Sequence, residues 1–119
     1  LAVMDVMKRD DYAGKARHIG EVVMKRYKEL QEKYPVIGDV RGLGAMIGIE
    51  LVKDKETKEP ATELAARLIQ NAIQKGLLLE NCGTAGNVVR FLAPLTMTDE
   101  QMEKGLEIFE ASLKEAMEA

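Results

Sequence analysis

The sequence has a single cysteine, Cys82, and a single histidine, His18, in 119 residues. One cysteine excludes an internal disulfide and points to a reducing compartment such as the cytoplasm. A lone histidine, with no second histidine or cysteine at ligand spacing, rarely makes a metal site, so we expect His18 at the surface or half-buried. Cys82 lies in a loop-forming stretch without a nearby histidine, so its neighbours give no support to a nucleophilic role. We therefore expect no metal site and assign no catalytic residue.

A basic excess and long apolar runs are also lacking. Seventeen Lys and Arg residues against twenty Asp and Glu residues give a net charge of -3, which argues against a nucleic-acid partner. No apolar run approaches the roughly 20 residues that span a bilayer, so we expect no membrane partner. The length fits one domain with one hydrophobic core.

Three stretches repeat apolar residues every three or four positions, which is the pattern of amphipathic helices. The first follows the capping pair Asp10–Asp11 and is stopped by Pro35. The second ends near Gly76, and the third begins with the capping box from Thr98 to Gln101.

Four stretches between these helices favour strands, at about 37–41, 45–52, 77–80 and 88–93. The stretch from Gly42 to Gly44 is interpreted as a bend or bulge. The expected order is helix, strand, strand, helix, strand, strand, helix. Short links between the strands favour an α+β fold, with an antiparallel sheet of about four short strands covered by three helices.

The glycines of "GDVRGLGAMIG" suggest a phosphate-binding loop, but the context excludes it. Such a loop needs a helix N-terminus after it, or a lysine followed by serine or threonine. A β-rich stretch comes next here instead, so these glycines are interpreted as structural.

The sequence begins with "LAVMDVMKRD", whose apolar residues already have helical spacing with no capping residue before them. We therefore expect the chain to be a fragment of a longer protein. Within it, residues 1–34 are expected to be a linking helical region, and residues 35–119 a small domain of sheet and helices.

Arg90 is the most informative charged residue. It lies inside the apolar run "NVVRFLAPLT", and burying an unpaired guanidinium is costly. Arginine suits two-point recognition of a carboxylate, so Arg90 is a candidate anion-binding residue. A salt bridge, or a side chain reaching solvent from a sheet edge, would explain it equally well. Arg41 adjoins Asp39, and a local surface pairing accounts for it.

Two segments, "YPVIGDVRGLGAMIGIELVKD" and "LLLENCGTAGNVVRFLAPLTMTDEQMEKGLEIFEASL", resemble the C-terminal part of class III pyridoxal-phosphate aminotransferases. The resemblance is greatest to the 4-aminobutyrate aminotransferase group and covers essentially the whole chain. It implies the C-terminal portion of the small domain of a homodimeric transferase. It also implies a large domain, absent from this sequence, that holds pyridoxal phosphate and the lysine that binds it.

The resemblance implies a role for one residue of this chain. Arg90 matches the family arginine that binds the substrate carboxylate, whereas no cofactor-binding or catalytic residue matches a position here. The implied reaction moves the amino group of 4-aminobutyrate, ornithine or another ω-amino acid to a 2-oxo acid, and the fragment alone is expected to be inactive. The alternatives are an autonomous α+β domain that binds a small carboxylate, and a dimerisation domain in which Arg90 is satisfied internally.

Overall fold

The computed structural model describes residues 1–119 as four helices and one four-stranded sheet. The helices are α1 (Ala2–Arg9), α2 (Tyr12–Lys33), α3 (Thr62–Gln74) and α4 (Asp99–Glu118). The strands are β1 (Ile37–Leu43), β2 (Met46–Leu51), β3 (Glu80–Cys82) and β4 (Val88–Phe91). All neighbouring strands are antiparallel, in the order β1-β2-β4-β3. The predicted α+β class and its antiparallel sheet are confirmed, and α1 is an additional short helix before the predicted three.

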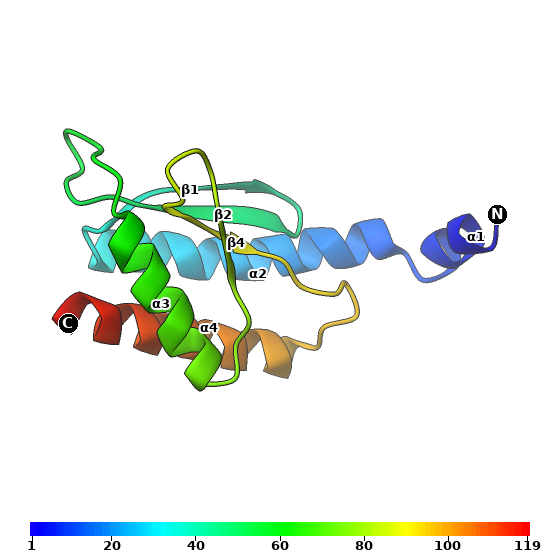
Figure 1. Cartoon of the computed structure of the whole chain (residues 1–119). Helices are drawn as coiled ribbons and strands as arrows, with labels where there is room; N and C mark the ends of the chain where they lie inside the picture. The colour runs from blue at the N-terminus through cyan, green and yellow to red at the C-terminus, as the bar shows by residue number, and fades with distance from the viewer.

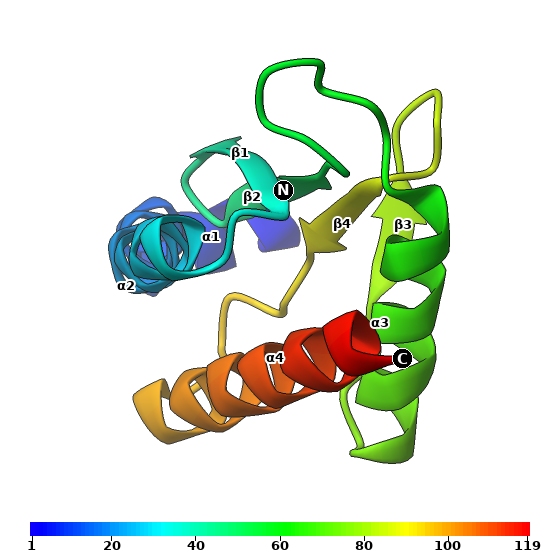
Figure 2. The same ribbon diagram turned by 90° about the vertical axis from the view of Figure 1, so that its left-hand side faces the viewer.

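The sheet is covered by helices on one face and open on the other. Figure 2 shows α2 beside β1, α4 beneath the sheet, and α3 alongside α4 and β3. The strand side chains that point toward the helices are buried: Ile37, Val40, Ile47, Ile49, Leu51 and Val89. The residues between them on each strand point to the open face. None of the four helices is long and apolar enough to cross a membrane.

The break between α1 and α2 lies at Asp10–Asp11. Asp11 adopts a left-handed conformation with φ of 46°, and its carboxylate accepts a hydrogen bond from the backbone N–H of Gly14 at 3.2 Å. This is the predicted N-cap of the long helix. Helix α1 has no buried residue and projects away from the rest of the molecule (Figure 1).

The hairpin between β1 and β2 differs from the predicted one. Gly42 pairs regularly with Ile47, and the two-residue turn lies at 44–45, where Gly44 has φ of +56°. The irregularity in the ladder lies instead at Gly38, between Ile37 and Asp39. The bend predicted over 42–44 therefore begins later in the structure, because the glycine with positive φ, and not the first glycine, ends the strand.

Helix α2 crosses this hairpin at Gly20, where the two backbones meet closely. A Cβ added to Gly20 would lie 2.3 Å from the carbonyl oxygen of Gly44, far inside van der Waals contact. We expect Gly20→Ala to lower the free energy of unfolding by about 1–3 kcal/mol through overpacking, although alanine favours a helix. The matched control is Gly105→Ala in α4, where the added Cβ would lie 3.7 Å from a Leu77 methyl. Urea unfolding should show a loss for the first variant and none for the second; equal behaviour would contradict the close approach.

A polar contact between α2 and α4 gives the fold a pH-dependent component. Lys33 Nζ donates to Glu110 Oε1 at 2.5 Å, and the Tyr34 hydroxyl donates to the same oxygen at 2.9 Å. The bond from Lys33, reinforced by Tyr34, holds the pKa of Glu110 below its ordinary value despite partial burial. A lowered carboxyl pKa stabilises the fold above the ordinary glutamate pKa of about 4.3, and this stabilisation is lost as the pH falls through the folded-state pKa.

We therefore expect Glu110→Gln to destabilise the protein at pH 7, with a difference from the wild type that shrinks below about pH 4. Urea unfolding at several pH values measures this difference. Glu107→Gln, on the same helix at an exposed position without an ion pair, serves as the control. A difference that stayed constant from pH 7 to pH 3 would show that the Glu110 carboxylate is not favoured by folding.

Candidate functional site: an arginine on the open sheet face

Strand β4 places Arg90 within the sheet and not at its edge. The strand lies between β2 and β3, so the explanation of a side chain that reaches solvent from a sheet edge is wrong. Val89 and Phe91 point into the core, as the alternation predicts, while Arg90 points to the open face. Its side chain is 40% exposed. Val89 and Phe91 thus pack the hidden face of the sheet, and the Arg90 side chain remains partly accessible.

Hydrogen bonds around the loop 83–87 fix the position of β4. The buried side chain of Asn87 donates to the carbonyl of Leu51 at 2.8 Å, and Leu51 returns a backbone hydrogen bond to the Asn87 carbonyl at 2.8 Å. The Thr62 hydroxyl donates to the carbonyl of Ala85 at 2.7 Å. These three hydrogen bonds tie the loop to the end of β2 and the start of α3, so they fix the register of β4 and with it the position of Arg90.

Arg90 has one protein partner. Glu80 lies directly opposite it on β3, and Arg90 Nη2 donates to Glu80 Oε2 at 2.5 Å. The Arg90 Nε atom is buried and has no hydrogen-bond partner. A guanidinium carries five N–H donors, so most of the donor capacity of Arg90 remains unused by the chain.

A second arginine lies in the same cross-strand row. Arg41 on β1 is opposite Gly48 on β2, and Gly48 is opposite Arg90, so the two arginines are about 10 Å apart, two strand spacings. Arg41 Nη1 donates to Asp39 at 3.0 Å and to Glu50 at 2.8 Å. The hydrogen bond to Asp39 and, to a smaller extent, the one to Glu50 raise the pKa of the Arg41 guanidinium. The predicted local pairing of Arg41 with Asp39 is therefore present, and Glu50 is a second carboxylate beside this arginine, whereas Arg90 has only one.

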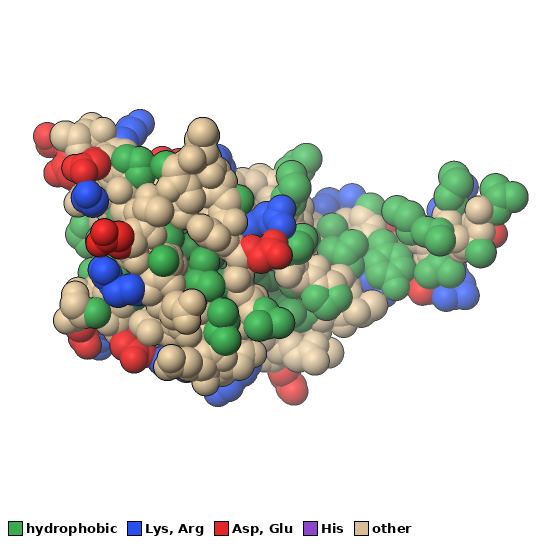
Figure 3. Space-filling model, viewed as in Figure 1, with side chains coloured by type: hydrophobic (Ala, Val, Ile, Leu, Met, Phe, Trp, Pro, Cys, Tyr) green, Lys and Arg blue, Asp and Glu red, His purple; other side chains and the backbone are tan.

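Exposed apolar side chains accompany the arginines. They come from the ends of all four strands or the segments next to them: Leu43, Met46, Leu78 and Leu92. Leu92 lies two residues after Arg90 and Leu78 lies two before Glu80, just outside β4 and β3. In Figure 3, hydrophobic side chains gather over the middle of the molecule and along its N-terminal projection. Such a surface is unusual for a face that meets only water.

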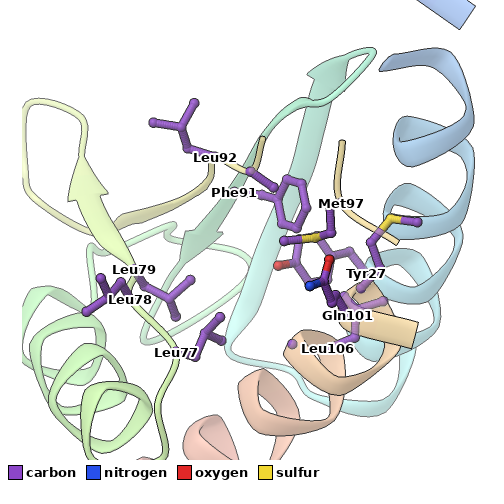
Figure 4. A pocket seen from close by; sticks show the side chains of 12 residues that line it. Tyr27, Leu77, Leu78, Leu79, Phe91, Leu92, Met97, Gln101 and Leu106 are labelled. Atoms are coloured by element: carbon purple, nitrogen blue, oxygen red, sulfur yellow. The ribbon is translucent and has the colours of Figure 1, made fainter. Parts of the chain in front are cut away.

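A small cavity opens next to the end of β4. It has a volume of about 120 Å³ and is lined mainly by apolar groups, including Tyr27, Phe91 and Met97 (Figure 4). Burial raises the pKa of Tyr27, so its hydroxyl stays protonated. Gln101 is the one lining residue with a polar amide, and no lysine or arginine lines the cavity. The cavity therefore offers shape and apolar contact but no site for a charged group.

The other residues singled out from the sequence lie away from Arg90 or play local parts. His18 is exposed on α2, and its Nε2 is 2.7 Å from Asp99 Oδ1 at the start of α4. Cys82 is partly buried at the end of β3, and not in the loop as predicted. No group of three His, Cys, Asp or Glu side chains is arranged to hold a metal ion.

Glu80 is the residue of this site that the sequence interpretation missed. It is ten positions from Arg90, at the end of the strand predicted over 77–80. The signal was the turn-forming stretch 83–87: folding the chain symmetrically about it places Cys82 opposite Val88 and therefore Glu80 opposite Arg90. The strand begins later than predicted because the apolar stretch 77–79 pairs with no other strand.

Comparison with known sequences assigns the chain to a family. The family model described as Aminotransferase class-III matches residues 1–113. The 5-aminovalerate aminotransferase DavT of Pseudomonas aeruginosa is 45% identical over 108 residues, which are 91% of this chain and 25% of that protein. The 4-aminobutyrate aminotransferase GabT of Escherichia coli is 42% identical over 116 residues, 98% of this chain and 27% of that protein. The alanine/serine racemase of Pyrococcus horikoshii is 38% identical over 116 residues, 98% of this chain and 24% of that protein.

Comparison with solved structures agrees. An amine transaminase from an uncultivated Pseudomonas species, in its PLP-bound form, matches with a TM-score of 0.85 and 32% identity. The match covers 98% of this chain and 26% of that one. The chain thus spans about a quarter of the length of the relatives it matches.

Proposed function

The chain belongs to the class-III aminotransferase family, and from this premise we propose that it is the carboxylate-binding part of an aminotransferase for ω-amino acids. The observation that carries the proposal is Arg90, held in the sheet with one partner and unused donors on an open, partly apolar face. The amino donors named for DavT and GabT, 5-aminovalerate and 4-aminobutyrate, each have a carboxylate at the end opposite the amine. We propose that 4-aminobutyrate or a homologue of it donates its amino group to a 2-oxo acid.

The role of Arg90 in this proposal is orientation. Two parallel N–H···O bonds fix both the position and the plane of a carboxylate. With its carboxylate held, an unbranched ω-amino acid presents its amine at a defined distance, and such positioning contributes substantially to the rate of a reaction between bound groups. Arg90 itself transfers no proton, because a guanidinium stays charged at all working pH values.

We propose that the residues of this chain do not themselves form the site for pyridoxal phosphate. The cavity beside β4 is lined by apolar groups and Gln101, without a lysine or a cluster of phosphate-binding donors. We propose that the cofactor, which supplies the electron sink for amino transfer, is bound by a separate large domain. The relatives are much longer than this chain, and the additional length leaves room for such a domain. The open sheet face with its exposed leucines is the surface proposed to meet that domain.

The organisation of the chain is proposed on the same basis. Residues 1–34 would link the large domain to the small domain formed by 35–119, and the absence of buried residues in α1 supports a linking role for the first helix. The whole protein is proposed to be a homodimer.

The test of this function begins with the coding sequence upstream of Leu1. Because this chain covers about a quarter of the length of its relatives, we expect an open reading frame about three times as long as this chain upstream of it. The protein segment that it encodes should include a lysine in a cofactor pocket. The encoded protein should transfer the amino group of 4-aminobutyrate or 5-aminovalerate to a 2-oxo acid, whereas the 119-residue chain with added pyridoxal phosphate should not. Fast turnover by the 119-residue chain, or inactivity of the longer protein with both donors, would contradict the proposal.

The similarity to an alanine/serine racemase favours one alternative, the racemisation of an α-amino acid. The same assay distinguishes the two reactions, because a racemase inverts an α-amino acid without consuming a 2-oxo acid. If the chain is an autonomous carboxylate-binding domain, the 119-residue chain should bind glutarate by itself. A dimerisation domain would leave carboxylate binding unchanged when Arg90 is replaced.

A further inference from the structure

We propose that Asn87 is a positioning residue of the carboxylate site: its side-chain amide holds the start of β4, so that Arg90 meets an entering carboxylate in one orientation. The inference rests on the proposed function, because it assigns a second residue to the site of Arg90. Asn87 contacts neither substrate nor cofactor in this proposal and acts only through the strand that follows it.

The side chain of Asn87 is buried next to the strand that carries the arginine. Asn87 is only 5% exposed, and it directly precedes β4, three residues before Arg90. It is one of two buried polar residues in the chain, and the other, Ser112, has a hydroxyl without a hydrogen-bond partner. Burying an amide costs free energy unless it is hydrogen-bonded, so the bond that Asn87 makes determines where its side chain lies.

The amide of Asn87 completes the pairing between β2 and β4. The register that places Glu50 opposite Val88, continued by one residue on each strand, brings Leu51 opposite Asn87. The Leu51 N–H donates to the Asn87 carbonyl at 2.8 Å, as in a regular antiparallel ladder. The Leu51 carbonyl accepts its bond from the side-chain nitrogen of Asn87, also at 2.8 Å. In this last pair the side-chain amide therefore takes the place of a backbone N–H.

The same carbonyl joins β4 to a helix. The Leu51 oxygen also accepts a hydrogen bond from the backbone N–H of Ala61, at the start of α3, at 3.0 Å. Removing the side-chain amide of Asn87 therefore leaves this buried carbonyl with one partner. We expect the protein to stay folded without the amide, while the start of β4 loses the bond that holds it to β2.

The position of Arg90 depends on few other contacts along its own strand. Strand β4 has only four residues, Val88–Phe91, and the segment 92–98 after it contains no helix or strand. Two-point binding requires the guanidinium to lie in the plane of the carboxylate, and a displacement of about 1 Å can cost about 100-fold in rate. An amine without a carboxylate does not use Arg90. Asn87 should therefore matter for substrates that carry a carboxylate and not for those that lack one.

The experiment compares Asn87→Ala with the wild type in the proposed longer protein. We expect kcat/KM for 4-aminobutyrate to fall about tenfold and that for a simple primary amine to change less than about twofold, because only the first depends on the position of Arg90. The Kd of glutarate, measured by calorimetry, should rise by a factor similar to the fall for 4-aminobutyrate.

Asn71→Ala is the matched control. The partly buried amide of Asn71 also donates to a backbone carbonyl, that of Ser112 at 3.3 Å, but it joins α3 to α4 and not to β4. Its replacement removes the same kind of bond and should change neither the ratio of the two kcat/KM values nor the Kd of glutarate.

Equal changes for 4-aminobutyrate and the plain amine in Asn87→Ala would overturn the proposal, because an asparagine that only supports the fold affects both alike. No change for either amine would overturn it as well. Urea unfolding checks that the variant is folded. If it is not, Asn87→Ser, a milder change that keeps a polar side chain but not the amide, is judged by the same ratio.

Arg90→Ala in the same assay separates failure of this proposal from failure of the proposed function. If Arg90→Ala lowers kcat/KM for 4-aminobutyrate selectively and the Asn87 variant does not, only the positioning role of Asn87 is wrong. If neither variant distinguishes 4-aminobutyrate from the plain amine, Arg90 is not the carboxylate site and both proposals fail.

Discussion

Arg90→Ala in the proposed longer protein is expected to lower kcat/KM for 4-aminobutyrate by about 100-fold, with KM raised by the lost contact and kcat lowered by the lost orientation, because truncating one partner of a buried hydrogen-bonded charge pair costs roughly 2–5 kcal/mol. About 1.4 kcal/mol corresponds to a factor of ten in rate or affinity. Arg90→Lys keeps the charge but loses the planar fork, so it should retain part of the affinity and lose orientation. Steady-state kinetics with the three forms measures the series.

Two controls separate a lost carboxylate contact from general damage. Arg41→Ala removes an arginine from the same cross-strand row, but two carboxylates of this chain, Asp39 and Glu50, already offset its charge, so kcat/KM should change less than about threefold. A simple primary amine without a carboxylate should react equally well with Arg90→Ala and with the wild type. Two results would contradict a carboxylate contact at Arg90. One is that Arg41→Ala lowers kcat/KM as much as Arg90→Ala does. The other is that Arg90→Ala lowers kcat/KM for the plain amine as much as for 4-aminobutyrate.

The variant should remain folded. Arg90 and Glu80 are both substantially exposed, and such pairs contribute at most about 1 kcal/mol to the free energy of unfolding. The urea midpoint of Arg90→Ala is therefore expected close to that of the wild type. A large shift would mean that the arginine mainly holds the sheet together.

Phe109→Ala is expected to have the largest effect on stability. Phe109 is buried in α4, and its ring centroid lies 5.0 Å from that of Tyr27 in α2. Replacing a buried phenylalanine with alanine typically costs about 3–5 kcal/mol through lost transfer energy and the cavity left behind. Domains of this size are stable by only about 5–15 kcal/mol, so the variant should be close to unfolding at room temperature.

Urea unfolding followed by circular dichroism measures the change. Phe109→Leu should lose clearly less, because leucine fills part of the volume. Glu107→Ala, at an exposed position of the same helix, should change the free energy of unfolding by less than about 0.5 kcal/mol. A loss below about 1 kcal/mol for Phe109→Ala would show that α2 and α4 do not share the core described here.

Local signals in the sequence predicted the helices well. The Thr98 side chain accepts from the backbone N–H of Gln101, and the Gln101 side chain accepts from that of Thr98, as the predicted capping box requires. Asp11 likewise caps α2. Both signals depend on residues within one turn of each other, so no tertiary contact is needed to recognise them.

The site depends on pairing between strands, which is harder to derive from one sequence. The alternation of side chains along a strand places Val89 and Phe91 on the face opposite Arg90, and the structure agrees. It did not predict that β4 lies inside the sheet, or that Glu80 is opposite Arg90, because both depend on strand order and register. Register depends on turn geometry, and loop 83–87 has no single glycine pair that fixes it.

The most direct measurement is a crystal structure of the longer protein with glutarate bound. We predict that one glutarate carboxylate accepts two hydrogen bonds from Arg90, each about 2.7–2.9 Å between nitrogen and oxygen. A carboxylate bound by other residues, with the contact between Arg90 and Glu80 intact, would contradict it.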